Sequence, residues 1–150
     1  MKKIITAFLT VIAVTAFAQS SKIELPLNKP VTLNEPAEYK GLVITVTKIE
    51  FVDRLEAEGE KPLVNEDSDA TFCRIFYTIK NGTKAPIDVS PKRNFSLKDD
   101  KNNSFNPPDD FKSWCFMDVI TNLSPGLSKK GSTFFLIPKE TKNVTVLYGR

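Results

Sequence analysis

The sequence predicts an all-β protein built as a β-sandwich, and three observations lead to this fold class. Residues 72–83 alternate side chains between two faces and end at Asn81-Gly82, which predicts a central strand followed by a tight turn. Further short alternating segments recur with turn residues between them, as they do in sandwiches. No long helical pattern follows the N-terminal segment, so the rest of the chain is expected to be nearly all β.

Residues 1–18 are expected to form a secretory signal peptide. Lys2 and Lys3 precede the uncharged run 4–17, and Ala-Phe-Ala at 16–18 fits a small-x-small cleavage site. The alternative, an N-terminal membrane anchor, is less favoured because the run is short for a span of about 20 residues and contains threonines. No cysteine at the cleavage point can accept a lipid. We therefore expect a secreted or periplasmic protein without a stable membrane anchor once the signal is removed.

Charge and residue types exclude several classes of protein. The chain carries 21 basic and 18 acidic residues; without Lys2 and Lys3 the numbers are 19 and 18, so no nucleic-acid partner is expected. The absence of histidine excludes Ser-His-Asp and Cys-His nucleophile systems and the usual zinc sites. The six glycines are scattered at turns and form no phosphate-binding loop. We expect no catalytic residues, no cofactor and no metal site.

Within the processed chain, residues 19–37 are expected to be a lead-in or edge segment, and residues 38–150 a single sandwich domain. Pro30 and Pro36 place the lead-in at an edge or in irregular structure, because proline cannot donate to a strand ladder. The first long strand is expected at residues 42–52.

The apolar positions of this first strand switch from even-numbered to odd-numbered residues near its middle. The apolar positions are Leu42, Ile44 and Val46 before Thr47-Lys48, and Ile49 and Phe51 after it. One extra residue in a strand restores the original face, so the pattern predicts a β-bulge there.

Residues 53–69 form the most acidic segment, with seven acidic residues against Arg54 and Lys61. Gly59, Pro62 and the polar run predict a long loop. Two interpretations remain open: a solvated loop, or a site for a cation or a basic partner. The candidate residues for such a site are Glu56, Glu58, Glu60, Glu66, Asp67 and Asp69. The spacing lacks the order of a calcium-binding loop, which favours the solvated loop.

Later strands are shorter and separated by turns. They are expected at residues 87–89, 94–98, 104–105, 132–137 and 144–148, the last two forming a closing pair joined across residues 138–141. Residues 109–123 fit both helical and strand spacing, and we expect an irregular segment with a helical turn there.

The segment 109–123 also contains the densest aromatic cluster, Phe111, Trp114 and Phe116. These side chains are candidates for an exposed binding patch, since aromatic residues anchor interfaces and carbohydrate contacts. The other interpretation is that they fill the core, and it is favoured because a small sandwich needs large side chains at its centre.

The two cysteines, Cys73 and Cys115, are candidates for one disulfide because exported domains commonly use such cross-links. The alternative is that both are small buried apolar residues. The pairs Asp99-Asp100 and Asp109-Asp110 are conceivable acid–base carboxylates, although aspartate is common in surface turns.

The order of segments at residues 41–53, 76–91, 95–105 and 123–140 resembles a known family. It is similar to bacterial exported immunoglobulin-like domains of unknown function, to the secreted mycobacterial immunoprotective antigen and, more distantly, to telokin-like sandwiches. This resemblance covers roughly residues 38–149. It implies an immunoglobulin-like antiparallel β-sandwich outside the cytoplasm, with no established catalytic role and no active-site residues to carry over.

Together these observations predict an exported, non-enzymatic binding module that presents loops to a protein or glycan partner in the cell envelope. The acidic segment 53–69 is the expected contact surface. The alternative is a small envelope hydrolase or a cation-binding protein that uses loop carboxylates.

Overall fold

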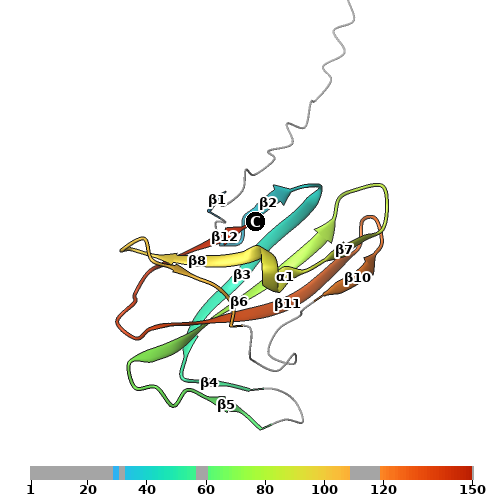
Figure 1. Ribbon diagram of the computed structural model, residues 1–150. Coiled ribbons are helices and arrows are strands. Elements are labelled where there is room, and N and C mark those ends of the chain that lie inside the picture. Colours follow the sequence, from blue (N-terminus) through green and yellow to red (C-terminus); the bar gives the residue numbers. More distant parts are fainter. Residues whose placement is uncertain (1–28, 31–32, 57–60, 109–118, 150) are drawn as a thin grey trace, which may run out of the picture.

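The computed structural model describes residues 29–30, 33–56, 61–108 and 119–149 (Figure 1). The described elements, in chain order, are β1 (Lys29–Pro30), β2 (Pro36–Tyr39), β3 (Leu42–Val52), β4 (Arg54–Leu55), β5 (Leu63–Val64), β6 (Ala70–Asn81), β7 (Ile87–Val89), α1 (Pro91–Asn94), β8 (Phe95–Asp99), β9 (Ser104–Phe105), β10 (Ile120–Leu123), β11 (Ser128–Pro138) and β12 (Val144–Tyr148). Within these ranges, no helix has the length and hydrophobicity needed to cross a bilayer.

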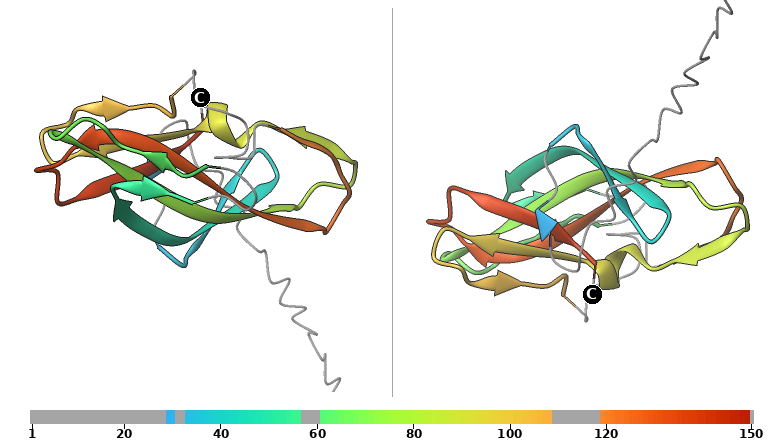
Figure 2. Two further views of the ribbon diagram at one scale, coloured as in Figure 1. Left: turned by 90° about the horizontal axis from the view of Figure 1, so that it is seen from below. Right: turned by 90° about the horizontal axis from the view of Figure 1, so that it is seen from above.

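The strands form two four-stranded antiparallel sheets with orders β11-β6-β3-β2 and β1-β12-β8-β9. Two smaller antiparallel pairs, β10-β7 and β4-β5, complete the described structure. In both views of Figure 2 the gold β8 and β9 lie on one side of the molecule, and the teal β3 and green β6 lie on the other. The expected all-β antiparallel sandwich is therefore confirmed.

Strand β6 is central, as residues 72–83 predicted. It pairs with β11 along nearly its whole length on one side and with β3 on the other. Its inner face packs into a core that both sheets build. The buried β6 residues are Cys73, Ile75, Tyr77 and Ile79, and the opposing sheet contributes Phe95, Leu97, Val146 and Tyr148.

The predicted bulge in β3 is also confirmed. Val46 pairs with Tyr77 and Lys48 pairs with Phe76, which leaves Thr47 as the extra residue. After the bulge, Phe51 pairs with Cys73 and so faces the inner side of the sheet, yet it is 43% exposed.

The prediction of a tight turn at Asn81-Gly82 was wrong. Neither residue has a positive φ, and β7 pairs with β10 rather than with β6. The chain leaves the sheet after Asn81 and crosses to a separate strand pair. The physical reason lies in the side chain of Asn81, which is fully buried and bonded to two backbone segments, the loop at Thr83 and Ala85 and the end of β10 at Leu123.

The closing strands do not pair with each other either. β11 belongs to the sheet of β6, whereas β12 pairs with β8 in the other sheet. The residues between them therefore connect the two layers. Within the segment expected as a lead-in, residues 29–30 form edge strand β1, which pairs with β12, and residues 36–37 begin edge strand β2.

The acidic segment 53–69 is not a plain loop, which corrects the prediction. It contains the β4–β5 hairpin, whose Leu55 and Leu63 pack on the outer face of the β6 sheet against Phe72 and Phe134. The last two rings meet edge to face with centroids 5.4 Å apart. This second apolar cluster fixes the hairpin to the sheet and sets the position of the acidic residues that follow it.

Candidate functional site

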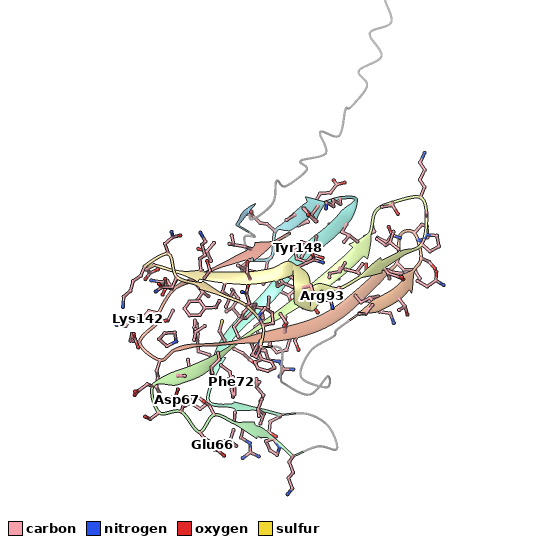
Figure 3. The ribbon with its side chains drawn as sticks, in the orientation of Figure 1. Glu66, Asp67, Phe72, Arg93, Lys142 and Tyr148 are labelled. Carbon is pink, nitrogen blue, oxygen red and sulfur yellow. The ribbon has the colours of Figure 1, made fainter. Side chains whose placement is uncertain are left out.

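An open groove lies at the end of the molecule where β6 begins and β11 ends. Residues 67–70 line one side and residues 136–140 the other, enclosing about 900 Å³. The backbone N–H of Lys139 donates to the carbonyl of Asp69 across the groove at 2.9 Å. Figure 3 shows Asp67 at this end and Lys142 on the same side of the molecule. We call this surface, residues 67–70 and 136–140, the acidic groove.

The turn that carries the acidic side chains is built by Asn65. Its Nδ2 donates to the carbonyls of Asp67, at 3.0 Å, and Ala70, while its Oδ1 accepts from the Asp67 N–H at 3.2 Å. The Asp67 carboxylate then accepts from the Asp69 N–H at 2.9 Å. Asparagine and aspartate commonly form such side chain to backbone turns. The sequence interpretation missed Asn65, although the Asn-x-Asp spacing was the available signal.

Asp53 ties the groove to the sheet. Its carboxylate accepts from the Thr71 hydroxyl at 3.2 Å and lies 3.8 Å from Lys139 Nζ. These contacts connect the end of β3, the start of β6 and the end of β11, so the rim of the acidic groove rests on three strands.

A second hollow of about 170 Å³ adjoins the acidic groove at Pro138 and Glu140. It lies between the β8–β9 turn and the β11–β12 connection. Desolvation acts to raise the pKa of Asp99, but hydrogen bonds from the Asn103 side chain and from the Asn103 and Lys101 backbone outweigh it, and the net pKa is lowered. Asp99 therefore stays ionised and organises its turn.

The structure separates the acidic residues that the sequence grouped together. Glu66, Asp67 and Asp69 share one turn, and Asp67 and Asp69 line the groove. Glu56 instead lies on the hairpin in an ion pair with Arg54. Glu58 and Glu60 lie outside the described residues. Among the residues that are described, no three aspartate, glutamate or cysteine side chains converge closely enough to hold a metal ion.

Cys73 is buried in the core and forms no disulfide with any described residue. Burial raises the pKa of its thiol to about 12, so the thiol is protonated and unreactive at neutral pH. Its expected partner Cys115 lies outside the described residues, as do the aromatic candidates Phe111, Trp114 and Phe116 and the pair Asp109-Asp110. The disulfide and the aromatic patch stay predictions.

Comparisons with known proteins agree on a β-sandwich of unknown function. A family model described as "Domain of unknown function (DUF4352)" matches residues 31–150. No curated protein matches the sequence.

Two solved structures share the fold. A conserved hypothetical protein from Bacillus anthracis has a TM-score of 0.60 and 19% identity over 77% of this chain and 85% of its own. An uncharacterized beta-sandwich protein from Clostridium difficile 630 has a TM-score of 0.53 and 15% identity over 85% of this chain and 91% of its own. The matches support the resemblance at the level of an unknown-function β-sandwich family, and not the specific immunoglobulin-like relatives.

Proposed function

The chain belongs to the DUF4352 family of domains of unknown function, and on that premise we propose that it is an exported, non-enzymatic binding module. Its contact surface is the acidic groove. Its partner is a basic segment of another protein in the cell envelope. Export rests on the predicted signal peptide at residues 1–18, and the contact surface rests on the geometry of the groove.

The observation that carries the proposal is the combination of charge and apolar surface in the acidic groove. Asp67, Asp69 and Glu140 supply carboxylates, while the 38%-exposed Leu136 and the half-buried Pro138 supply apolar surface. An acidic rim beside an apolar strip suits a peptide that carries both lysine or arginine and aliphatic side chains. No aromatic residue lines the groove among those described, which favours a protein over a glycan as the partner.

Two observations, one on Asp99 in the hollow beside the groove and one on composition, favour binding over catalysis. A carboxylic acid that donates a proton near neutral pH needs a raised pKa. At Asp99 the shift goes the other way, because its neighbours stabilise the charged form. The absence of histidine removes the commonest general base from the whole chain.

Two charge-neutralising variants test the proposal. In D67N/E140Q two of the three groove carboxylates become amides, and the asparagine keeps an oxygen that accepts from the Asp69 N–H. The matched control E35Q/E38Q removes the same charge near β2, away from the groove. Each protein is immobilised and incubated with envelope extract of the producing cells, and bound proteins are quantified by mass spectrometry.

We expect the groove variant to lose a specific set of basic proteins that the parent and the control both retain. The loss should match the effect of raised salt on the parent, because exposed charges are screened over about 10 Å at ~0.1 M salt. Equal recovery by D67N/E140Q and the parent, with unchanged melting temperatures, would rule out the acidic groove as the contact surface.

A further inference from the structure

The end of the sandwich opposite the acidic groove is basic. β6 runs between the two ends over 12 residues, which corresponds to roughly 36 Å at the usual rise of a strand. Four exposed lysines lie at its far end: Lys80, Lys84, Lys129 and Lys130. They come from two distant parts of the chain, which the pairing of Lys80 with Ser128 brings together. We call residues 80–86 and 124–130 the basic tip.

The two loops of the basic tip are held together by Asn81. Its backbone N–H donates to the carbonyl of Leu127 at 2.9 Å, and its carbonyl accepts from the Gly126 N–H at 2.7 Å. Its side-chain Nδ2 donates to the carbonyls of Ala85 and Leu123, at 2.8 Å each. Because one buried residue bonds to both loops, the tip is a preformed surface.

An apolar side chain protrudes from this surface. Leu127 is 58% exposed, the most exposed large hydrophobic side chain among the described residues. Exposed Pro125 precedes it, and exposed Ala85 and Pro86 lie on the neighbouring loop. Nothing in the fold requires leucine there, since its side chain adds little to the core. An exposed apolar side chain beside lysines is the combination that interfacial membrane contacts use.

Among the described residues, few carboxylates oppose the lysines. The Asp88 carboxylate on β7 accepts a hydrogen bond from the Asn122 N–H at 2.7 Å, and Glu38 lies on edge strand β2. The aspartates and glutamates of the 65–69, 99–103 and 138–143 turns all lie at the other end. A chain with 19 basic and 18 acidic residues after signal removal is nearly neutral, so it attracts an anionic surface only because its charges are separated.

We propose that the basic tip docks on a bilayer of anionic lipids. In this arrangement Leu127 enters the boundary between head groups and acyl chains, and the lysines approach the lipid phosphates. The contact is peripheral and reversible, because one leucine and four lysines bind far more weakly than a spanning segment. It also points the acidic groove away from the membrane, although the docking does not depend on that groove having a partner.

Vesicle flotation tests the proposal with the processed protein purified from the producing cells. The probes are vesicles of equal parts phosphatidylglycerol and phosphatidylcholine, and vesicles of phosphatidylcholine alone. The variants are K80E/K130E and L127S at the tip. The control, K101E/K142E, makes the same change in net charge at exposed lysines of the opposite end.

We expect the parent to bind the anionic vesicles at low salt and to leave the neutral ones free. Each lysine near an anionic surface contributes about a fivefold change in partition, so K80E/K130E should lower binding by more than tenfold. L127S should weaken binding without changing its dependence on salt. The control should bind as the parent does.

Three results would overturn the docking. One is no binding of the parent to the anionic vesicles at low salt. Another is an equal loss in K80E/K130E and K101E/K142E, which would mean that only net charge matters. The third is full binding by L127S together with equally tight binding of soluble polyphosphate, which would make the tip a general anion site and not a lipid-docking surface.

Discussion

At the residue scale, Asn81 is the side chain on which the most backbone connections converge. It is fully buried, and all of its hydrogen-bonding groups are satisfied. Besides the two carbonyls that its Nδ2 reaches, its Oδ1 accepts from the Thr83 N–H at 2.8 Å and from the Thr83 hydroxyl at 2.7 Å. Only an amide supplies two donors and an acceptor in this arrangement, which explains asparagine at this position.

Asn81→Ala should destabilise the protein by about 3 kcal/mol or more, because it leaves the buried carbonyl of Leu123 and the partly buried carbonyl of Ala85 without this donor. Asn81→Asp should cost a similar amount, since a carboxylate oxygen would face those carbonyls. Urea unfolding measures both changes. Asn103→Ala is the control, because Asn103 is exposed and should cost less than about 1 kcal/mol. A loss at Asn81 no larger than at Asn103 would contradict this role.

Gly82 shows which part of a turn signal can be predicted. The Asn-Gly pair correctly marks the end of the strand. Glycine is needed there because another backbone segment lies too close for a Cβ, and not because the residue has a positive φ. A Cβ on Gly82 would lie 2.9 Å from the carbonyl oxygen of Gly41, and the Gly82 N–H donates to that oxygen at 2.8 Å. Close approach of two distant backbone segments leaves no local pattern in a sequence.

At the scale of elements, the β4–β5 hairpin shows how composition can hide structure. Seven acidic residues dominate segment 53–69, yet Leu55 and Leu63 determine where it lies. Strands of two residues are too short for an alternating pattern to reveal them. The bulge at Thr47 was predictable because β3 is eleven residues long, so the switch of its apolar positions from even to odd numbers is visible in the sequence.

Leu55→Ala should release the hairpin. Leu55 is 3% exposed and packs on Phe72 and Phe134, so its truncation should cost about 2 kcal/mol or more. Hydrogen exchange should accelerate in residues 53–64 more than in the middle of β6, because the main core is untouched. Val64→Ala, at a 54%-exposed position of the same hairpin, should change little. Uniform acceleration across both sheets would mean that the hairpin belongs to the main cooperative core.

Sheet membership was the part of the fold that local patterns did not reveal. The alternation in β11 and β12 correctly indicates two strands, but their partners are β6 and β8. Whether a turn joins two strands of one sheet or crosses between sheets depends on contacts far apart in the chain. The same reason accounts for β7, which follows β6 in the chain and pairs with β10.

At the scale of the whole molecule, the long antiparallel strands separate charge. β3, β6 and β11 each run from one end to the other, so their terminal residues gather at two opposite surfaces. The acidic end was partly predictable, because much of its charge is contiguous in sequence. The basic tip was not, since Lys80 and Lys130 meet only through the register of β6 and β11.

The acidic end also bears on the alternative of cation binding. Its carboxylates come from three turns and, among the described residues, do not converge as a ligand set. We therefore expect millimolar calcium or magnesium to shift the melting temperature no more than sodium chloride of equal ionic strength. A site with a dissociation constant a thousand times below the ion concentration would stabilise the protein by about 4 kcal/mol, a shift of many degrees that calorimetry would detect. D67N/E140Q should behave as the parent does. A saturable calcium response that this variant loses would instead make the groove a cation site, and a basic partner would then have to compete with the ion for the same carboxylates.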